Sequence, residues 1–528
     1  MIRATTPVDR LDRDGRTLLL YERSVVELHP LGLAAFEASA DGIDMDALTH
    51  RLVTTFGAPP EGAVADIVAR IVADLVQRGV LVLELDDEAS EPKRGSMPRL
   101  DCVHVPRVLL PTAEVDASRW AVIACDQFTS QPDYWDEVEH TVGDAPSTLR
   151  MVLPELHLNA PDVAERIAGC QHAMREYLSA GLLEPHDAFV YVERGVTHGV
   201  QRGLVVALDL EAYDFSAAST SLVRSTEGTV LDRLPPRMAV RREAALELPH
   251  ILVLYDDPDH TVLADVLTRR DDLPVAYDVE LMAGSGRLTG RFVADPALQA
   301  SVLDSLAALI EPDAYRARYG LDADAPILFA MGDGNHSLAT AKGIWDELRA
   351  AGARPDHPAR HALVELVNLH EASVRFEPIH RVVFGAGSLA SDLPAALGAE
   401  VTPMTGLAEV LDAIATPSAS QRFGLVSSES YALVEVPEPS HQLVVGTVQD
   451  HLDAWIALHP HASLDYLHGE DATDAIARRP GNLGVLLPGL SKDAFFRSIA
   501  VDGPLPRKTF SMGHARDKRF YMECRAIR

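Results

Sequence analysis

The sequence has little cysteine, little positive charge and no long apolar run. Only four of its 528 residues are cysteines, and none forms a CxxC pair, which argues against a zinc knuckle or a redox dithiol. Lys and Arg total 47 against 78 Asp and Glu, a net charge of −31, which argues against a broad nucleic-acid interface. No run approaches the ~18 apolar residues of a membrane span, and the charged N-terminus lacks a secretory apolar core. The sequence therefore predicts a cytoplasmic protein that binds neither nucleic acid nor membrane.

The composition otherwise predicts a globular chain with more than one domain. Hydrophobic residues make up 47% of the sequence, which is enough to form hydrophobic cores, and the charged share of 24% is ordinary for a globular protein. Residues 85–99, LDDEASEPKRGSMPR, mix charges with Pro, Gly and Ser and show no apolar periodicity, so we interpret them as a linker. The linker separates a unit of residues 1–84 from a much larger one.

The small unit reads as a winged-helix-like arrangement. Strands are predicted at 16–21, 25–28 and 80–83, and helices at 31–38, after Asp44 and after Asp66. This order, with DGRTLLLYERSVVELHPLGLAAFEAS and VARIVADLVQRGVLV, resembles the PqqD-like domains, or RiPP recognition elements, over residues 1–88. The resemblance implies a partner: a precursor's leader peptide, bound as an added strand. A plain winged-helix dimerisation or DNA-binding module is the alternative.

The large unit alternates strands and helices, so the predicted fold class is mixed α+β and α/β. Strands are predicted at 120–125, 189–194, 203–210, 251–255, 327–331, 443–448, 485–487 and 520–524. We expect residues 100–385 to form the main α/β catalytic domain and residues 386–440 a small subdomain or insertion. Residues 441–528 are expected to complete the catalytic domain with C-terminal strands.

The most informative motif is PILFAMGDGNHSLATAKGIWDEL, residues 326–348, in which an apolar strand runs through a glycine-flanked aspartate into a helix. Glycines let a ligand approach the backbone closely, and a helix N-terminus favours phosphate. We predict that Asp333 is catalytic and holds Mg²⁺, and that His336 is catalytic. Phosphate contacts are predicted from Gly334, Asn335 and Ser337. The structural alternative is a helix cap at Asn335 or Ser337, with Asp333 filling a tight turn.

Arginines cluster in residues 222–242, LVRSTEGTVLDRLPPRMAVRR, within this acidic chain. Arg grips phosphate through two parallel hydrogen bonds, so Arg224, Arg233 and Arg237 are predicted nucleotide contacts. Glu227 lies among them and is predicted to accept a proton from an attacking hydroxyl. A solvated loop with Arg–Glu surface pairs is the alternative.

Two further segments supply candidate contacts. Asp126 and Gln127 follow a buried strand, and polar residues at the carboxyl end of a strand often line the site in α/β folds. Cys125 beside them is interpreted as a buried structural thiol. Arg507 and Lys508 in PRKTFS, residues 506–511, are adjacent cations that can close over a phosphate. Solvated charges beside a C-terminal strand are the alternative there.

The large unit resembles the domain-of-unknown-function family 1015 over residues 98–528. The resemblance is carried by WAVIACDQFTSQPDYWDEVEHTVGDAPSTLRMVLPE, SLVRSTEGTVLDRLPPR, LELPHILVLYDDP, MGDGNHSLATAK, FEPIHRVVF and DGPLPRKTFSMG. Its Asp-Gly-x-His element, here Asp333, Gly334 and His336, is similar to the DGHHR element of free serine kinases of the ParB/sulfiredoxin-like group. In this chain Asn335 replaces that element's first His and Ser337 replaces its Arg.

Together these features favour an enzyme of peptide maturation. The N-terminal unit would hold a leader peptide while the large unit phosphorylates a Ser or Thr of the core peptide, with ATP or a related nucleotide and Mg²⁺. The phosphate would remain or leave in a dehydration. Two other functions stay open: a non-catalytic adaptor that binds leader peptide and nucleotide, and a small-molecule kinase with a regulatory N-terminal domain.

Overall fold

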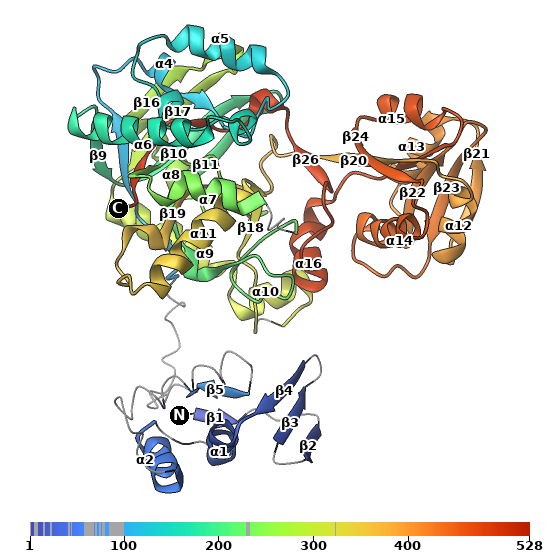
Figure 1. Cartoon of the computed structure of the whole chain (residues 1–528). Helices are drawn as coiled ribbons and strands as arrows, with labels where there is room; N and C mark the ends of the chain where they lie inside the picture. The colour runs from blue at the N-terminus through green and yellow to red at the C-terminus, as the bar shows by residue number, and fades with distance from the viewer. Residues whose placement is uncertain are drawn as a thin grey trace. The chain divides into compact units, whose positions relative to one another are not determined.

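The computed structural model describes residues 100–228, 233–322 and 324–528, and before them residues 2–4, 9–13, 16–21, 24–40, 43, 45–56, 68, 71–72, 75 and 80–83. The chain divides into two compact units, residues 1–96 and 97–528 (Figure 1). This division falls inside the segment 85–99 that composition predicts as a linker, although the residues of that segment lie outside the described part.

The N-terminal unit contains the strands and helices that the sequence predicts. β3 (Arg16–Tyr21) and β4 (Ser24–Leu28) form an antiparallel sheet with β2 (Asp9–Arg13), while β1 (Ile2–Ala4) pairs with β5 (Leu81–Leu83). α1 (Pro30–Ala38) and α2 (Met45–Phe56) follow. Residues 68, 71, 72 and 75 of the predicted third helix are helical, and its other residues lie outside the described ones. β1 and β2 were not predicted.

A ten-stranded mixed sheet forms the centre of the large unit. Its strand order is β12-β13-β18-β15-β19-β11-β10-β17-β16, with β6 paired to β11. The strands are β6 (Val103–His104), β10 (Phe189–Val196), β11 (Gly199–Asp209), β12 (Tyr213–Asp214), β13 (Val223–Arg224), β15 (Leu252–Tyr255), β16 (Val275–Glu280), β17 (Arg287–Val293), β18 (Phe329–Asp333) and β19 (His361–Asn368). Most pairs are antiparallel, whereas β12, β13 and β18 run parallel and β15 runs parallel to β19.

Both faces of this sheet are buried, as the alternation along β10 shows. Phe189 and Tyr191 belong to one hydrophobic cluster, whereas Val190 and Val192 belong to another, because successive strand residues point to opposite faces. The first cluster includes residues of α9 (Pro296–Ala308) and α11 (Asn335–Ala350). The second includes residues of α5 (Pro132–Val142) and α6 (Val163–Ser179).

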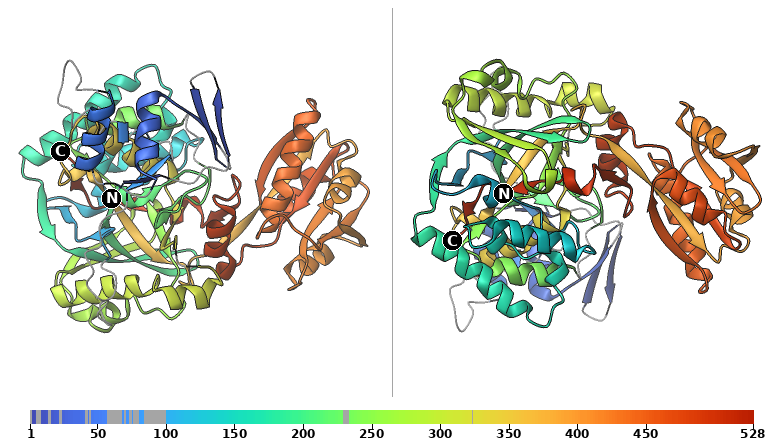
Figure 2. Two further views of the ribbon diagram at one scale, coloured as in Figure 1. Left: turned by 90° about the horizontal axis from the view of Figure 1, so that it is seen from below. Right: turned by 90° about the horizontal axis from the view of Figure 1, so that it is seen from above.

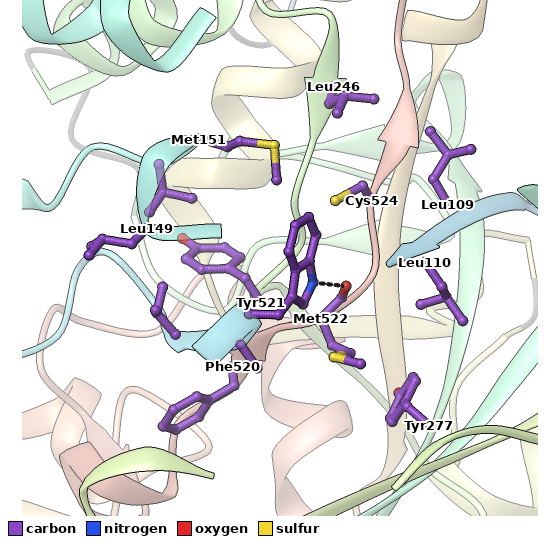
Figure 3. Close-up of a cluster of buried hydrophobic side chains, with 14 of the residues drawn as sticks. Leu109, Leu110, Leu149, Met151, Leu246, Tyr277, Phe520, Tyr521, Met522 and Cys524 are labelled. Atoms are coloured by element: carbon purple, nitrogen blue, oxygen red, sulfur yellow. Dashed lines mark hydrogen bonds between the residues drawn. The ribbon is translucent and has the colours of Figure 1, made fainter. Parts of the chain in front are cut away.

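The second cluster is closed by residues from the far end of the sequence (Figure 3). β27 (Phe520–Tyr521) pairs with β8 (Val122–Ile123), and β28 (Arg525–Ala526) pairs with β14 (Leu246–Glu247). Trp120, which is fully buried at the end of α4 (Ala117–Trp120), donates its indole N–H to the carbonyl of Met522 at 2.9 Å. The sequence predicted a strand over residues 120–125, but in the structure the strand there is β8, which has only two residues.

A second, seven-stranded antiparallel sheet has the order β21-β23-β22-β25-β20-β24, with β26 paired to β20. Its strands are β20 (Phe376–Phe384), β21 (Glu400–Met404), β22 (Gln421–Val426), β23 (Tyr431–Val436), β24 (Ser463–His468), β25 (Asn482–Leu486) and β26 (Phe510–Met512). The sheet thus reaches beyond the predicted subdomain of residues 386–440. β24 and β25, which lie in the predicted C-terminal segment 441–528, hydrogen-bond to β20 and therefore extend the second sheet, not the ten-stranded one.

The strand predicted at 443–448 is wrong, because a helix, α14 (Val444–Leu458), begins there. Val445, Val448 and Leu452 are buried at helical spacing against the second sheet. The remaining helices of this part are α12 (Leu389–Ala396), α13 (Leu407–Ala415) and α15 (Glu470–Ala477).

α16 (Lys492–Asp502) lies between the two sheets, where Figure 2 shows it in dark red. Phe495, Phe496 and Ile499 of this helix share a hydrophobic cluster with Leu254 of the large sheet and Phe376 of the second one. Within the described residues, no helix is both long enough and apolar enough to cross a membrane.

Replacing Trp120 with Phe is expected to lower the free energy of unfolding by about 1–3 kcal/mol, because it leaves the buried Met522 carbonyl without its donor. Urea unfolding measures the change. Trp455→Phe is the matched control, since the indole of Trp455 donates to the more accessible Asp392 at 3.0 Å. Equal losses in the two variants would contradict the proposed role of the buried hydrogen bond.

Candidate functional site

The strand–turn–helix predicted at residues 327–337 is present. β18 ends at Asp333, Gly334 adopts φ 82°, and α11 begins at Asn335. A Cβ on Gly334 would lie 3.2 Å from the Cα of Ile251, so this position needs glycine for space as well as for its left-handed backbone. The N–H of Gly334 is donated to Asp333 Oδ1 at 2.9 Å, and so Gly334 does not offer that N–H to a phosphate as the sequence predicted.

Asp333 forms an ion pair with Lys518, a residue that sequence reasoning missed. Lys518 Nζ lies 2.9 Å from Asp333 Oδ2, and both side chains are largely buried. Burial works to raise the pKa of Asp333, but the Lys518 ammonium, His250 and the Gly334 N–H together lower it below its ordinary value. The carboxylate is therefore ionised and already neutralised by a cation of the chain itself.

His336 lies in the first turn of α11 as a neutral imidazole. Burial, and then the nearby cations Arg237 and Arg233, lower its pKa to about 4. Its Nε2 is buried without a hydrogen-bond partner among the described residues. A neutral imidazole with an unpartnered nitrogen is suited to contact a bound ligand.

Ser337 begins a chain of hydrogen bonds that the sequence did not reveal. Its Oγ lies 3.1 Å from His250 Nε2, and His250 Nδ1 lies 3.0 Å from the Tyr521 hydroxyl. The Tyr521 oxygen in turn accepts the N–H of Cys125 at 3.1 Å. Burial raises the pKa of the Cys125 thiol to about 12, which agrees with its interpretation as a structural thiol.

These residues line an apolar cavity of about 140 Å³ that also touches Arg237 and Glu155. Met151, Leu246 and Leu363 supply apolar walls. The cavity therefore combines apolar walls with polar groups from several segments, among them Ser337 and Thr340 of α11. Such a combination is typical of small-molecule sites.

Glu227 has a carboxyl group whose pKa is perturbed by its surroundings. Burial raises its pKa, although Lys508, the N–H groups of Thr509 and Lys508, and Arg381 all act to lower it. Its backbone is fixed by a bridge to Leu505, whose N–H is donated to Thr226 at 2.7 Å. Glu227 and Lys508, predicted separately from segments 280 residues apart, thus lie close together.

The predicted arginines separate into two groups. Arg224 is buried and donates to the carbonyls of Ser221 at 2.9 Å and Ala325 at 2.7 Å, so its guanidinium holds two loops together and is not a ligand contact as predicted. Arg237 at the start of α7 (Leu234–Arg242) pairs with Glu155, and the exposed Arg233 precedes it. Both lower the pKa of His336 and therefore lie near the start of α11.

Asn335 is used by the protein itself. Its Oδ1 lies 3.0 Å from Ser225 Oγ, and its amide donates to Thr226 Oγ1 at 3.3 Å. These bonds fix the Ser225–Glu227 strand end against α11. The structural alternative for Asn335 is therefore better supported than a phosphate contact.

Of the remaining predicted contacts, three lie near the start of α11 and one does not. Asp126 acts on the pKa of His336 and accepts a hydrogen bond from the Gln127 amide at 3.0 Å, so both lie near the site. Lys508 adopts φ 57° and acts on both Glu227 and His336. Arg507, by contrast, donates to the Tyr466 hydroxyl at 2.7 Å and pairs with Asp453 of the second sheet's region, so its predicted phosphate contact is not supported.

Comparisons with known proteins confirm the family resemblance for most of the large unit. The family model described as "Protein of unknown function (DUF1015)" matches residues 108–455, which is more than half of the chain. No curated protein matches the sequence. The comparisons give no evidence for the PqqD-like resemblance of the N-terminal unit.

Solved structures show only distant similarity to the chain. A free serine kinase variant in complex with AMP is 12% identical, with a TM-score of 0.33 over 60% of this chain and 90% of that one. The same kind of variant in complex with ADP gives 11% identity and a TM-score of 0.33, over 60% and 91% of the two chains. A conserved hypothetical protein from Pyrococcus furiosus is 11% identical, with a TM-score of 0.31 over 61% and 95%.

Replacing Asp333 with Asn is expected to lower the free energy of unfolding at pH 7 by about 1–3 kcal/mol, since Lys518 then faces a neutral amide. The folded-state pKa of Asp333 is lower than the ~3.9 of an unfolded Asp. The stability from its charge is therefore present above about pH 4 and is lost as the pH falls through the folded-state pKa. Urea unfolding should show the two proteins converging below about pH 4.

The control is Asp346→Asn, which removes a more accessible carboxylate, 40% exposed against 24% for Asp333, from an i,i+4 pair on α11 with Lys342 Nζ 2.6 Å from Asp346 Oδ1. Helical i,i+4 pairs contribute about 0.3–0.5 kcal/mol. If Asp333→Asn cost no more than Asp346→Asn, the buried pair would not stabilise the end of β18.

Proposed function

We propose for this chain, which belongs to the DUF1015 family, that the large unit binds a nucleotide at the start of α11 and transfers a phosphoryl group to a hydroxyl acceptor. The observation that carries the proposal is the convergence of charges there. Arg233, Arg237 and Lys508 all act on His336, and Lys508 also acts on Glu227, whose pKa is raised. Three cations at one helix N-terminus favour an anionic ligand.

Each group has a distinct part in this proposal. Arg233, Arg237 and Lys508 neutralise phosphate charge, and the neutral His336 contributes an oriented hydrogen bond. Phosphoryl transfer depends mainly on positioning and charge stabilisation, and these fixed cations provide both. Gly334 contributes space, since it carries no side chain between the turn and the ligand.

Glu227 acts as the base that accepts the proton of the attacking hydroxyl. Its raised pKa makes the carboxylate a better proton acceptor than an ordinary exposed glutamate. We assign the acceptor to the class of Ser or Thr hydroxyls. ATP or a related nucleotide is the proposed donor.

Mg²⁺ is the metal expected with such a donor, where it neutralises the charge of the transferring phosphate. The ion pair of Asp333 with Lys518 makes that carboxylate a poor principal ligand. Asp126 fits better, because it accepts only an amide hydrogen bond and forms no ion pair within the described part of the chain. We therefore propose Asp126, together with phosphate oxygens, as the holder of Mg²⁺ and assign Lys518 to keep Asp333 neutralised.

The N-terminal unit carries a second proposal, the capture of a leader peptide. Among the described residues, β4 pairs only with β3 and β2 pairs only with β3, so both outer edges of this sheet can accept a strand. Tethering the peptide makes delivery of its core to the large unit intramolecular. An adaptor would bind nucleotide without transfer, and a small-molecule kinase would act on free serine-like acceptors.

Glu227→Gln is expected to lower turnover by about 10²–10⁴-fold while nucleotide affinity changes little, because the amide keeps the shape but cannot accept the proton. The assay incubates the full chain with ATP, Mg²⁺ and a Ser/Thr peptide and follows intact mass. The base must be deprotonated to act, and the pKa of Glu227 is raised above its ordinary 4.5. As the pH is lowered, wild-type turnover should therefore begin to fall at a pH above 4.5.

Arg233→Ala provides the complementary variant, expected to weaken nucleotide binding about tenfold, or ~1.4 kcal/mol. Arg316→Ala is the matched control, because Arg316 is an exposed arginine of α10 (Pro312–Tyr319) paired with Asp313. Nucleotide binding without any transfer would favour the adaptor. Equal nucleotide affinity in Arg233→Ala and Arg316→Ala would refute the phosphate site.

Deleting residues 1–96 is expected to weaken leader-peptide binding by far more than tenfold while the melting temperature of the large unit stays unchanged, because the two units are separately compact. Fluorescence anisotropy of a labelled peptide measures the binding. Unchanged affinity in the truncated protein would overturn the peptide-capture proposal and leave the phosphoryl-transfer proposal intact.

A further inference from the structure

Three histidines and one glutamate meet outside the residues assigned to the candidate site. His198 lies in the turn between β10 and β11, Glu377 lies on β20, and His514 follows β26. One ligand atom from each of these three residues lies within 4.8 Å of the other two. His468, at the end of β24, places its Nε2 2.5 Å from Glu377 Oε2.

The charge environment of Glu377 favours a metal cation. Its recorded ion-pair partners in the described part of the chain are the imidazoles of His198 and His468, and neither is a permanent cation. A comparable trio, His104, Asp209 and His361, lacks this property. Arg360 places its guanidinium on Asp209, with Nη2 2.6 Å from Oδ2, and so a fixed positive charge occupies the carboxylate there.

The backbone segments that carry the three residues are already held together. Asp517 Oδ1 accepts both the N–H and the hydroxyl of Thr197, each at 2.9 Å, while Asp517 Oδ2 accepts the N–H of His514 at 3.3 Å. This carboxylate therefore joins the immediate neighbour of His198 to His514 itself. On the other side, Glu377 is directly paired with Ser511 in the β20–β26 ladder.

We propose that His198, Glu377 and His514 bind a Zn²⁺ ion, with His468 as a positioning residue. Two imidazoles and one carboxylate form a donor set typical of Zn²⁺ with one position left for water. Glu377 Oε1 faces His198 at 3.9 Å and is the metal ligand, while Oε2 is held by His468. An orienting hydrogen bond to a ligating group is a regular feature of such sites.

The required adjustment is small. Metal–ligand distances of about 2.0–2.2 Å place tetrahedral ligand atoms about 3.4 Å apart. The present separations are within 4.8 Å, and His514 is exposed, so side-chain rotation can close the difference. The ion would fasten the β10–β11 turn of the large sheet to β20 of the second sheet and fix the segment that leads from His514 to Lys518.

Zn²⁺ titration of the chelator-treated full chain tests this proposal without any assay of activity. We expect one tight equivalent by competition with a chromophoric chelator, visible absorption on loading with Co²⁺, and a higher melting temperature with Zn²⁺. His514→Ala and Glu377→Gln should each weaken binding by more than about 100-fold, and His468→Ala by about 10–100-fold. His514 is exposed, so its replacement leaves the fold intact.

His104→Ala is the matched control, because it removes one histidine from the other trio. It should leave Zn²⁺ affinity and the melting-temperature increase unchanged. Wild-type affinity in His514→Ala and Glu377→Gln, or loss of the tight equivalent only in His104→Ala, would overturn the assignment. Neither outcome bears on nucleotide binding, so failure of this proposal is distinct from failure of the phosphoryl-transfer proposal.

Discussion

The buried guanidinium of Arg519 is the interaction on which the candidate site depends. Its side chain is only 2% exposed and pairs with two carboxylates that are equally inaccessible, Glu365 on β19 at 2.8 Å and Glu523 at 3.0 Å. Glu523 also accepts the Tyr277 hydroxyl at 2.5 Å. Removing one member would leave an uncompensated charge inside the domain, which costs several kcal/mol. Gly203 makes room for this network, because a Cβ there would lie 2.3 Å from Glu365.

Arg519 fixes the segment that completes the site on either side of it. Lys518, one residue before, reaches Asp333, and Tyr521, two residues after, reaches His250. The end of β18 and the start of α11 are therefore oriented by a segment that is distant in sequence. Lys518, the neighbour of Arg519 in the chain, is the cation that keeps the largely buried Asp333 ionised.

Local sequence patterns predicted the strand, glycine turn and helix of residues 327–337 because all three are encoded within a dozen residues. They also singled out His336, Glu227 and Lys508, and in the structure Lys508 acts on both of the other two. Lys518, His250 and Tyr521 were missed, since nothing local in the sequence shows their distant partners. Lys518 meets Asp333 across 185 residues, His250 meets Ser337 across 87, and Tyr521 meets His250 across 271. The segment FYMEC, residues 520–524, was predicted to be a strand, and its contact with the candidate site was not predicted. Arg224 was misassigned because composition cannot distinguish a buried structural arginine from a ligand contact.

The error at residues 443–448 has a similar cause. A short run of Leu and Val satisfies both strand and helix patterns, and its length does not decide between them. Apolar residues continue at helical spacing beyond residue 448: Val445, Val448 and Leu452 are all buried. This spacing identifies a helix. The limits of the second sheet were missed because β20 and β25 join it through long-range pairing.

The return of residues 520–527 to the hydrophobic cluster around Trp120 has a consequence for the order of events on the ribosome. Six of the seven strands of the second sheet, β20 to β25, lie within about 110 consecutive residues and can assemble as soon as these have emerged. The cluster around Trp120 must wait for Phe520 to Ile527, although most of its other residues are translated far earlier. During synthesis the cluster around Trp120 therefore stays incomplete while the second sheet forms, and its apolar residues remain exposed until the end of the chain has emerged.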